Sequence, residues 1–480
     1  MMSFAGFAVI LFIGLTLVVG VHTYSKIKGR AANYYVAGNA MPMAVIGITL
    51  CAQAFDANGS MGNASLSFSN GFWAGAVIPI GLASCLFLTG RWFARPLHKM
   101  RLLTLADFYR RRYDTRSETL ATILMMMSNI VLVAGNLAGL GLLLKLVFGT
   151  PYLPMVAAIA VCILAYAVSG GLYATITTSV LQVGMFVFSI GLAFFWLTGT
   201  VGWDAYIASV PTTSFGLDQL FATESGALVN WAALGSLALG DVVAIDFIQR
   251  VISAKSPRDA SRGCYLGGSI TLVVGLAVSV IGLSAFYFGK EESRFLLADL
   301  AINDMPMLVG VAVLLGIIAA SMSTASGVVL DLANLVTRNL FQRYSKTRWN
   351  DATMLRISRW IALPTMGTAV VFAYLRPEPG ILLILAFDIV LAGCFVPLAL
   401  GLFWSRANTP GAIASIVAGT SARMALHWLI PESLKGLDTL LAPVVSLVAF
   451  VGVSLLTQKK FPPRHEALTE VPTEEELVSG

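Results

Sequence analysis

The residues best suited to chemistry in this sequence lie in a run of small hydroxyl side chains, Ala319-Ala320-Ser321-Met322-Ser323-Thr324-Ala325-Ser326-Gly327. On a helix, Ala320, Ser323 and Thr324 occupy positions i, i+3 and i+4, so one carbonyl oxygen and two hydroxyl oxygens share a face. A small hard cation binds several oxygen atoms at short range. The pattern predicts part of a cation site. Alternatively, the hydroxyls bond the i−4 carbonyls of their own helix.

A second segment, Ala54-Phe55-Asp56-Ala57-Asn58-Gly59-Ser60, places a carboxylate, an amide and a glycine inside an apolar stretch. Irregular backbone in the hydrocarbon region is tolerated only where it lines a cavity or is buried in protein. Unwinding near Asp56 would free the carbonyls of Ala54 and Ala57. Together with Ala320, Ser323 and Thr324 these supply five oxygens from two helices, a set that suits sodium.

A third segment, Gly235-Ser236-Leu237-Ala238-Leu239-Gly240-Asp241, has the same weakness and is followed by Asp246. It predicts a second interrupted helix, although Gly235 and Gly240 could also serve close helix packing.

These segments are expected to lie on the helices of an all-α polytopic membrane protein. The 480 residues are 57% hydrophobic and 12% charged, with a mean hydropathy of +0.81, which leaves too much apolar surface for a soluble globule. Apolar runs of about 20 residues, each long enough to cross a bilayer, recur along the chain. We expect about thirteen transmembrane helices, at 5–23, 42–67, 71–94, 119–148, 153–169, 171–200, 227–251, 261–288, 305–336, 356–375, 380–404, 408–429 and 439–457.

The two interrupted helices are the second and seventh of these spans, the first members of two consecutive groups of five. Discontinuous helices at corresponding positions of two halves are typical of inverted-repeat transporters, with the binding site at the midplane. We therefore expect a single transporter domain over 1–460, with repeats at about 42–200 and 227–404. Residues 461–480 are expected to form a short cytoplasmic tail.

The charge of +6 reflects topology, and a nucleic-acid partner is not expected. If the N-terminus is outside, only Lys290, Arg294, Arg376 and Lys435 fall on the outer side, and Lys145 and Arg423 lie within spans. The other 25 of the 31 Lys and Arg residues share one side, which the positive-inside rule makes cytoplasmic. The basic connector 102–113 lies on that side and is expected to touch anionic membrane lipids. The oligomeric state is not predicted.

Buried polar residues near the midplane are candidates for binding a small organic solute. We expect this role for Gln53, Asp56, Asn58, Asn136 and Asp241, with Asn63, Asn129, Asp246 and Asp388 also available. A carboxylate facing the cavity would favour an ammonium-bearing solute such as an amino acid or amine, unless Asp56 instead serves the cation. No residue pattern distinguishes an amino acid from a monocarboxylate, a sugar or a vitamin. Alternatively, such residues bridge helices or cap broken helix ends.

At this point the chain resembles the sodium:solute symporter family, which includes proline permeases, sialic acid transporters and sodium/glucose cotransporters. The resemblance runs from about Tyr34 to beyond Arg338. It is carried in order by Tyr35-Val36-Ala37-Gly38, by Asp56, by Leu103-Thr104-Leu105-Ala106-Asp107-Phe108 through Arg112-Tyr113, by Gly170-Gly171-Leu172-Tyr173-Ala174, by Gln249 to Lys255, and by Ala320 to Ser326.

The resemblance implies thirteen helices, an external N-terminus, a five-plus-five inverted-repeat core and alternating access driven by the inward sodium gradient. It assigns sodium, as the co-transported ion, to the carbonyls of Ala54, Ala57 and Ala320 and the hydroxyls of Ser323 and Thr324. Asp56 matches an acidic position that couples sodium and substrate in proline-type members. A bacterial inner membrane is the expected location, with a cytoplasmic C-terminus.

The sequence departs from the family at a second sodium site that some members have. There an aspartate and a further serine are expected, whereas this chain has Ser179 and Gly327, so one sodium per cycle is predicted. Asn58 stands where proline-type permeases have a serine, so proline is not implied as the solute.

Other function classes are weaker. The four His residues form no metal cluster or catalytic pairing, and no GxxxxGK[ST] motif occurs, so an enzyme or a P-loop pump is not expected. A proton-coupled symporter, with Asp56 titrating, is an open alternative. A transporter-like sensor or channel is another.

Overall fold

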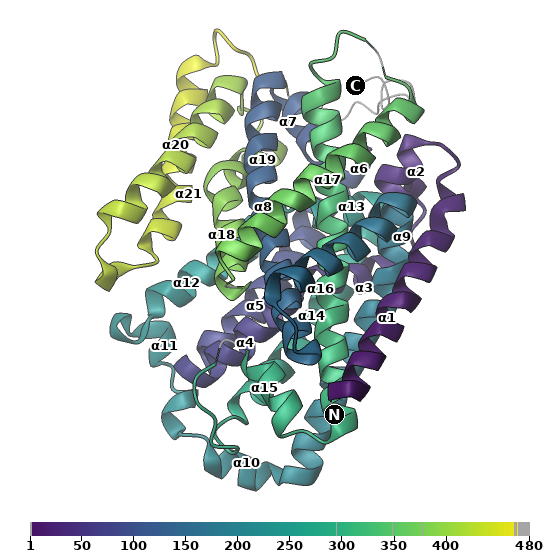
Figure 1. The fold of residues 1–480 in the computed structure, drawn as a ribbon. Coiled ribbons are helices and arrows are strands. Elements are labelled where there is room, and N and C mark those ends of the chain that lie inside the picture. The colour runs from purple at the N-terminus through teal and green to yellow at the C-terminus, as the bar shows by residue number, and fades with distance from the viewer. Residues whose placement is uncertain (1, 294, 348, 378, 465–467, 469–480) are drawn as a thin grey trace.

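The computed structural model describes residues 2–293, 295–347, 349–377, 379–464 and 468, and these residues form a bundle of helices (Figure 1). Most of the expected tail, 465–467 and 469–480, lies outside the described residues. The start of α1 and the short helices α10, α11 and α15 lie at one end of the bundle, and α2, α6 and α7 lie at the other. We call the latter the basic end, because Lys26, Lys28, Arg30 and the connector 102–113 belong to it.

The helices of the first half are α1 (Met2–His22), α2 (Ala31–Val36), α3 (Met43–Ala54), α4 (Ala57–Asn70), α5 (Phe72–Leu88), α6 (Ala94–Lys99), α7 (Ala106–Arg112), α8 (Thr115–Phe148) and α9 (Tyr152–Trp196). The remaining helices are α10 (Trp203–Ser209), α11 (Asp218–Phe221), α12 (Ala227–Gly235), α13 (Ile245–Ser253), α14 (Pro257–Leu283), α15 (Leu296–Asn303), α16 (Met307–Val336), α17 (Asp351–Leu375), α18 (Pro379–Val390), α19 (Val396–Phe403), α20 (Thr409–Leu429) and α21 (Leu437–Thr457).

Among the described residues, eight helices are long and apolar enough to cross a membrane, or nine if the bent pair α12 and α13 counts as one span. All thirteen predicted spans nevertheless fall on helices. The prediction 42–67 corresponds to the broken pair α3 and α4, and 356–375 and 408–429 lie in α17 and α20. The predictions 153–169 and 171–200 both fall in α9, which is interrupted at Gly171 (φ 57°, ψ −150°). Thirteen membrane crossings therefore remain a prediction.

The interruption in the second span lies where the sequence predicts it. Phe55 (φ −128°, ψ 90°) and Asp56 (φ −108°, ψ −165°) are extended and separate α3 from α4. The Asp56 carboxylate accepts a hydrogen bond of 2.9 Å from the backbone N–H of Gly59 and so caps the first turn of α4. An aspartate at this position satisfies one of the N–H groups that a helix start leaves unpaired.

The seventh span breaks later than predicted. The segment Ser236–Gly240 is π-helical and Asp241–Val243 forms a tight turn, but the backbone becomes extended only at Ala244 (ψ 124°), and the span bends by 48°. A Cβ at Gly240 would collide with the carbonyl oxygen of Phe387. Gly240 therefore serves close packing against α18, which was the alternative reading of this glycine.

The two broken spans meet at the basic end. The N–H of Met41, just before α3, donates to the carbonyl of Ser253 at 3.0 Å, and the N–H of Lys255, just after α13, donates to the carbonyl of Met41 at 2.8 Å. Backbone pairing of this kind holds the entrance of one broken span against the exit of the other.

A buried ion pair fastens the basic connector to the end of α16. Arg338 Nε lies 2.8 Å from Asp107 Oδ2, and Asn339 Nδ2 donates to both Asp107 (3.1 Å) and Glu118 of α8 (2.7 Å). Asp107 is 1% exposed. Burial alone would raise the pKa of Asp107, but the guanidinium groups of Arg338, Arg111, Arg110 and Arg343 lower it to about 2.

We expect Asp107→Asn to lower the melting temperature of the purified protein, because Arg338 would stay buried without its counter-ion. Removing one partner of a buried ion pair typically costs about 3 kcal/mol or more. Because the pKa of Asp107 is depressed from about 3.9, the stabilisation should be complete above about pH 4 and should fade as the pH falls toward 2. Asp204→Asn, at an exposed position in α10, is the control. Equal melting temperatures for the two variants would contradict the role assigned to Asp107.

Candidate functional site

The break between α3 and α4 packs directly against the hydroxyl run of α16. Four hydrogen bonds join them in the described part of the chain, one of them a long bond of 3.5 Å from Gln53 Nε2 to Ser323 Oγ. The N–H of Ala57 donates to Ser321 Oγ (3.0 Å), Thr324 Oγ1 donates to the carbonyl of Ala52 (3.0 Å), and Gln53 Nε2 donates to the carbonyl of Ser323 (3.2 Å). The structure thus brings together the two segments that the sequence analysis assigned to one cation site.

The five predicted cation ligands, Ala54, Ala57, Ala320, Ser323 and Thr324, are all buried. Thr324 Oγ1 lies 3.4 Å from the carbonyl oxygen of Ala320, farther than from Ala52, and Ser323 Oγ lies 2.7 Å from Ser179 Oγ in α9. Both hydroxyls make their shortest contacts to other helices. Thr324 Oγ1 also donates to the i−4 carbonyl of Ala320, so the alternative of bonding within α16 holds in part for Thr324. Among the described residues, no hydrogen bond ends on the carbonyl oxygen of Ala54.

A buried arginine occupies the space beside Gly327. A Cβ at position 327 would collide with a terminal nitrogen of Arg250 and would lie 2.9 Å from Gln53 Oε1. Arg250 Nη1 lies 3.5 Å from Asp331 Oδ2 and donates to the carbonyl of Asp246 at 2.7 Å. Because residue 327 is a glycine, the guanidinium of Arg250 fits beside it, one helical turn from the hydroxyls of Ser323 and Thr324 toward the C-terminus of α16.

Asp56, Asn58 and Asn136 form one polar cluster between α4 and α8. Asp56 Oδ2 accepts hydrogen bonds from Asn136 (2.5 Å) and Asn58 (3.2 Å), in addition to the bond from Gly59 to Oδ1. The amide oxygens of Asn58 and Asn136 have no hydrogen-bond partner among the described residues. Gly135 makes room for this arrangement, because a Cβ there would lie 2.8 Å from Asn58 Oδ1. The cluster presents oxygen acceptors without a basic side chain bonded to it.

The two other predicted solute residues lie elsewhere. Gln53 lies beside the hydroxyl run, where its Nε2 donates to the carbonyl of Ser323. Its Oε1 has no hydrogen-bond partner among the described residues. Asp241 is fully buried in the turn Asp241–Val243, which packs against α5 and α18, and its carboxylate has no partner within the described part of the chain. Neither side chain hydrogen-bonds to the Asp56 cluster.

Several polar residues instead hold helices together, as the alternative reading proposed. Asn63 Nδ2 donates to the carbonyl of Gly275 (2.7 Å) and Asn63 Oδ1 accepts from Ser279 (2.6 Å), which joins α4 to α14. Asp388 pairs with Arg423 of α20. Asn129 differs from these residues, because it donates to the carbonyl of Met125 in its own helix.

A cavity of about 310 Å³ lies farther along α4, on the side away from the basic end, between α4, α5, α12 and α18. Its walls are mostly apolar, with Ser65, Asn70 and Asn230 as polar members. Met61 and Gly62 line it and lie one turn beyond Asn58 on α4. A solute in this cavity would be separated from the Asp56 cluster by about one helical turn.

The sequence analysis missed two contacts that the structure makes prominent. Ser321 lies within the hydroxyl run but was not predicted to contact the broken span. An interrupted helix needs acceptors for its unpaired N–H groups, and this requirement could have pointed to Ser321. The contact between Arg250 and Asp331 was also missed. An arginine within a membrane span requires a partner, so a search for an intramembrane carboxylate could have found Asp331.

Comparison with known proteins addresses the family to which the chain belongs. The family model described as Sodium:solute symporter family matches residues 34–419. The chain is 22% identical over 499 residues to a sodium/glucose cotransporter of Vibrio parahaemolyticus, covering 93% of this chain and 89% of the relative. It is 26% identical to high affinity choline transporter 1 of Mus musculus over 87% of this chain and 76% of the relative.

Among solved structures, a Na⁺-coupled sialic acid symporter in a substrate-bound outward-open state superposes with a TM-score of 0.77 at 18% identity, covering 96% of this chain and 98% of that one. At this identity the likeness shows a shared fold. The family match extends from the start of the first broken span through the hydroxyl run and well beyond it. The chain therefore belongs to the sodium:solute symporter family and is a membrane transporter rather than an enzyme.

Proposed function

We propose that this member of the family imports a small organic solute together with one sodium ion per cycle, by alternating access. The observation that carries the proposal is the contact between the broken α3–α4 span and the hydroxyls of α16. Sodium would bind the carbonyl oxygens of Ala54, Ala57 and Ala320 and the hydroxyls of Ser323 and Thr324. All five residues are buried around this one contact.

A single sodium ion is favoured by the surroundings of Ser179 and Gly327. The hydroxyl of Ser179 bonds Ser323 and brings no charge. The guanidinium of Arg250 lies against Gly327, where it would repel a second cation in a low-dielectric interior.

The solute would bind at the Asp56 cluster and would enter from the cavity between α4, α5, α12 and α18. One carboxylate and two unpaired amide oxygens offer acceptors to a donor-rich group. That chemistry favours an ammonium-bearing solute such as an amino acid. Glucose, choline and sialic acid, for which the relatives are named, differ in charge. The proposed solute class therefore rests on the Asp56 carboxylate and not on similarity to these relatives.

The proposal includes thirteen membrane crossings, two inverted repeats (42–200 and 227–404), an outer N-terminus and a bacterial inner membrane. The charge distribution supports the outer N-terminus, because basic residues gather at the end of the bundle opposite to the start of α1. The meeting of the two broken spans at that end, through Met41 and Lys255, fits a pair of related repeats.

Proton coupling is the second candidate. Asp56 is a buried carboxylate whose hydrogen-bond donors are amides, so a proton could neutralise it during the cycle. A channel or sensor has no comparable observation in its favour.

The counter-ion can be decided by uptake into proteoliposomes. A melting-temperature panel of amino acids, amines, monocarboxylates and sugars, with and without sodium, would first identify the solute, since a ligand stabilises by its binding energy. We expect an inward sodium gradient to drive accumulation, and a proton gradient of equal size without sodium to drive none. Asp56→Asn should reduce uptake about tenfold or more, because a charged acceptor is lost. Accumulation driven by protons alone would overturn sodium coupling.

The cation site makes a separate prediction. Ser323→Ala and Thr324→Ala should each raise the sodium concentration for half-maximal uptake by about tenfold, the effect of losing one oxygen ligand. The folded protein should be retained at normal yield. Ser269→Ala, which removes an exposed hydroxyl on α14, is the matched control. Sodium activation that is unchanged in both site variants would exclude this placement of the ion.

Stoichiometry gives a third test. Sodium activation of uptake should follow a Hill coefficient of about one if a single ion binds. A flux ratio of two sodium ions per solute would show that Arg250 does not keep a second ion out.

A further inference from the structure

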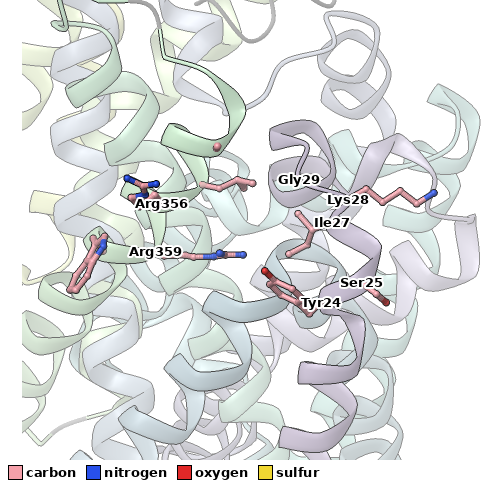
Figure 2. Close-up of a pocket in the computed structure, with 10 residues that line it drawn as sticks. Tyr24, Ser25, Ile27, Lys28, Gly29, Arg356 and Arg359 are labelled. Atoms are coloured by element: carbon pink, nitrogen blue, oxygen red, sulfur yellow. The ribbon is translucent and has the colours of Figure 1, made fainter.

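A separate cavity of about 470 Å³ lies at the basic end, away from the cation and solute sites. One wall is the segment Tyr24–Gly29, which follows α1, and the other is the first part of α17, including Leu355, Arg356, Arg359 and Trp360 (Figure 2). The transport mechanism described above makes no use of this cavity.

The cavity carries positive charge with no acidic partner. Arg356 and Arg359 are three residues apart, on one face of α17, and Lys28 stands on the opposite rim. Figure 2 shows Arg359 projecting toward Tyr24, while the Lys28 side chain extends away from the two arginines. Among the described residues, no carboxylate lies within 4.0 Å of these three cations. The cavity is therefore suited to an anion.

Arg359 is held in place before any ligand arrives. Its guanidinium lies 5.5 Å from the ring centroid of Tyr24 and 5.7 Å from that of Tyr34. The Tyr34 hydroxyl is itself bonded to the carbonyl of Val168 in α9 at 3.1 Å. A guanidinium stacked on aromatic rings loses little further freedom when it binds, and its planar donors match phosphate oxygens.

The rim of the cavity carries exposed aromatic rings. Trp360 is 67% exposed and Tyr24 is 56% exposed, and amphipathic rings of this kind are enriched at the level of lipid headgroups. The neighbouring surface of α1 exposes Phe7, Ile10, Leu11 and Val18, and α17 exposes Leu363 beyond Trp360. An anion that reaches this cavity would therefore have apolar helix surface on its membrane side.

We propose that this cavity binds the headgroup phosphate of an anionic phospholipid from the leaflet at the basic end. Arg356 and Arg359 would contact the phosphate, Lys28 would add longer-range attraction, and the acyl chains would lie along α1 and α17. A soluble phosphate would use the same arginines but would have no need of the exposed aromatic rim. Basic pockets between membrane helices on the positive side are suited to lipid headgroups.

The test uses the full chain, purified in detergent and delipidated, with phosphatidylglycerol titrated while the melting temperature is followed. We expect saturable stabilisation. Arg356→Gln should weaken the apparent affinity roughly fivefold, and the double variant Arg356→Gln, Arg359→Gln roughly thirty-fold, from the attraction typical of each basic residue near a lipid surface. The control removes two exposed charges at the same end but outside the cavity, Lys99→Gln and Arg262→Gln, and should change the affinity less than about twofold.

Arg356 is exposed, so its variant should fold normally and keep the lipid-free melting temperature of the parent. The proposal is overturned if phosphatidylglycerol stabilises Arg356→Gln and the control variant equally. It is also overturned if inorganic phosphate or glycerol 3-phosphate, at the same phosphate concentration, matches the lipid, because the ligand would then be soluble. Lipid binding here is independent of the transport mechanism, so loss of uptake in these variants is not required.

Discussion

A peptide group in the hydrocarbon region must find a hydrogen-bond partner inside the protein, and this requirement governs the centre of the molecule. Where the chain is extended at Phe55 and Asp56, the first N–H groups of α4 have no intrahelical acceptor. The Asp56 carboxylate accepts a hydrogen bond from the N–H of Gly59, and the Ser321 hydroxyl of α16 accepts one from the N–H of Ala57. The break is thus stabilised both by its own carboxylate and by the hydroxyl side chain that α16 places against it.

The same arrangement connects structure to transport. Ser323 reaches Ser179 in α9, and Thr324 reaches Ala52 in α3, so the hydroxyl run contacts helices at both ends of the proposed repeat 42–200. An ion bound among these oxygens would join α3, α9 and α16 more tightly than hydroxyl bonds alone. The ion would thereby favour one arrangement of the repeats over another, which is the physical requirement for coupling an ion to a conformational change.

Polar residues that look alike in sequence have different roles in the structure. Asp56 and Asp241 are both aspartates inside broken spans, yet Asp56 accepts hydrogen bonds from two side-chain amides, whereas the Asp241 carboxylate has no hydrogen-bond partner among the described residues. Gly235 and Gly240 looked like one weak segment, but Gly240 packs on Phe387 and the extended residue is Ala244. Gln53 was grouped with the solute residues and instead contacts the hydroxyl run. For Asp56, Gly240 and Gln53 the deciding factor is a neighbour on another helix, between 80 and 270 residues away in the chain.

Sequence alone determined the membrane class, the helical segments, the interruption at Asp56 and the hydroxyl face of Ala320, Ser323 and Thr324. These features follow from local composition and periodicity, because each apolar run must satisfy its own backbone within one segment. Only the tertiary structure decided which polar side chains meet. The grouping of Asp56 with Asn58 and Asn136, the position of Arg250 beside Gly327 and the contact between Ser321 and Ala57 each depend on how separate helices pack. Helix packing is set by shape complementarity among distant residues, and no local pattern encodes that property.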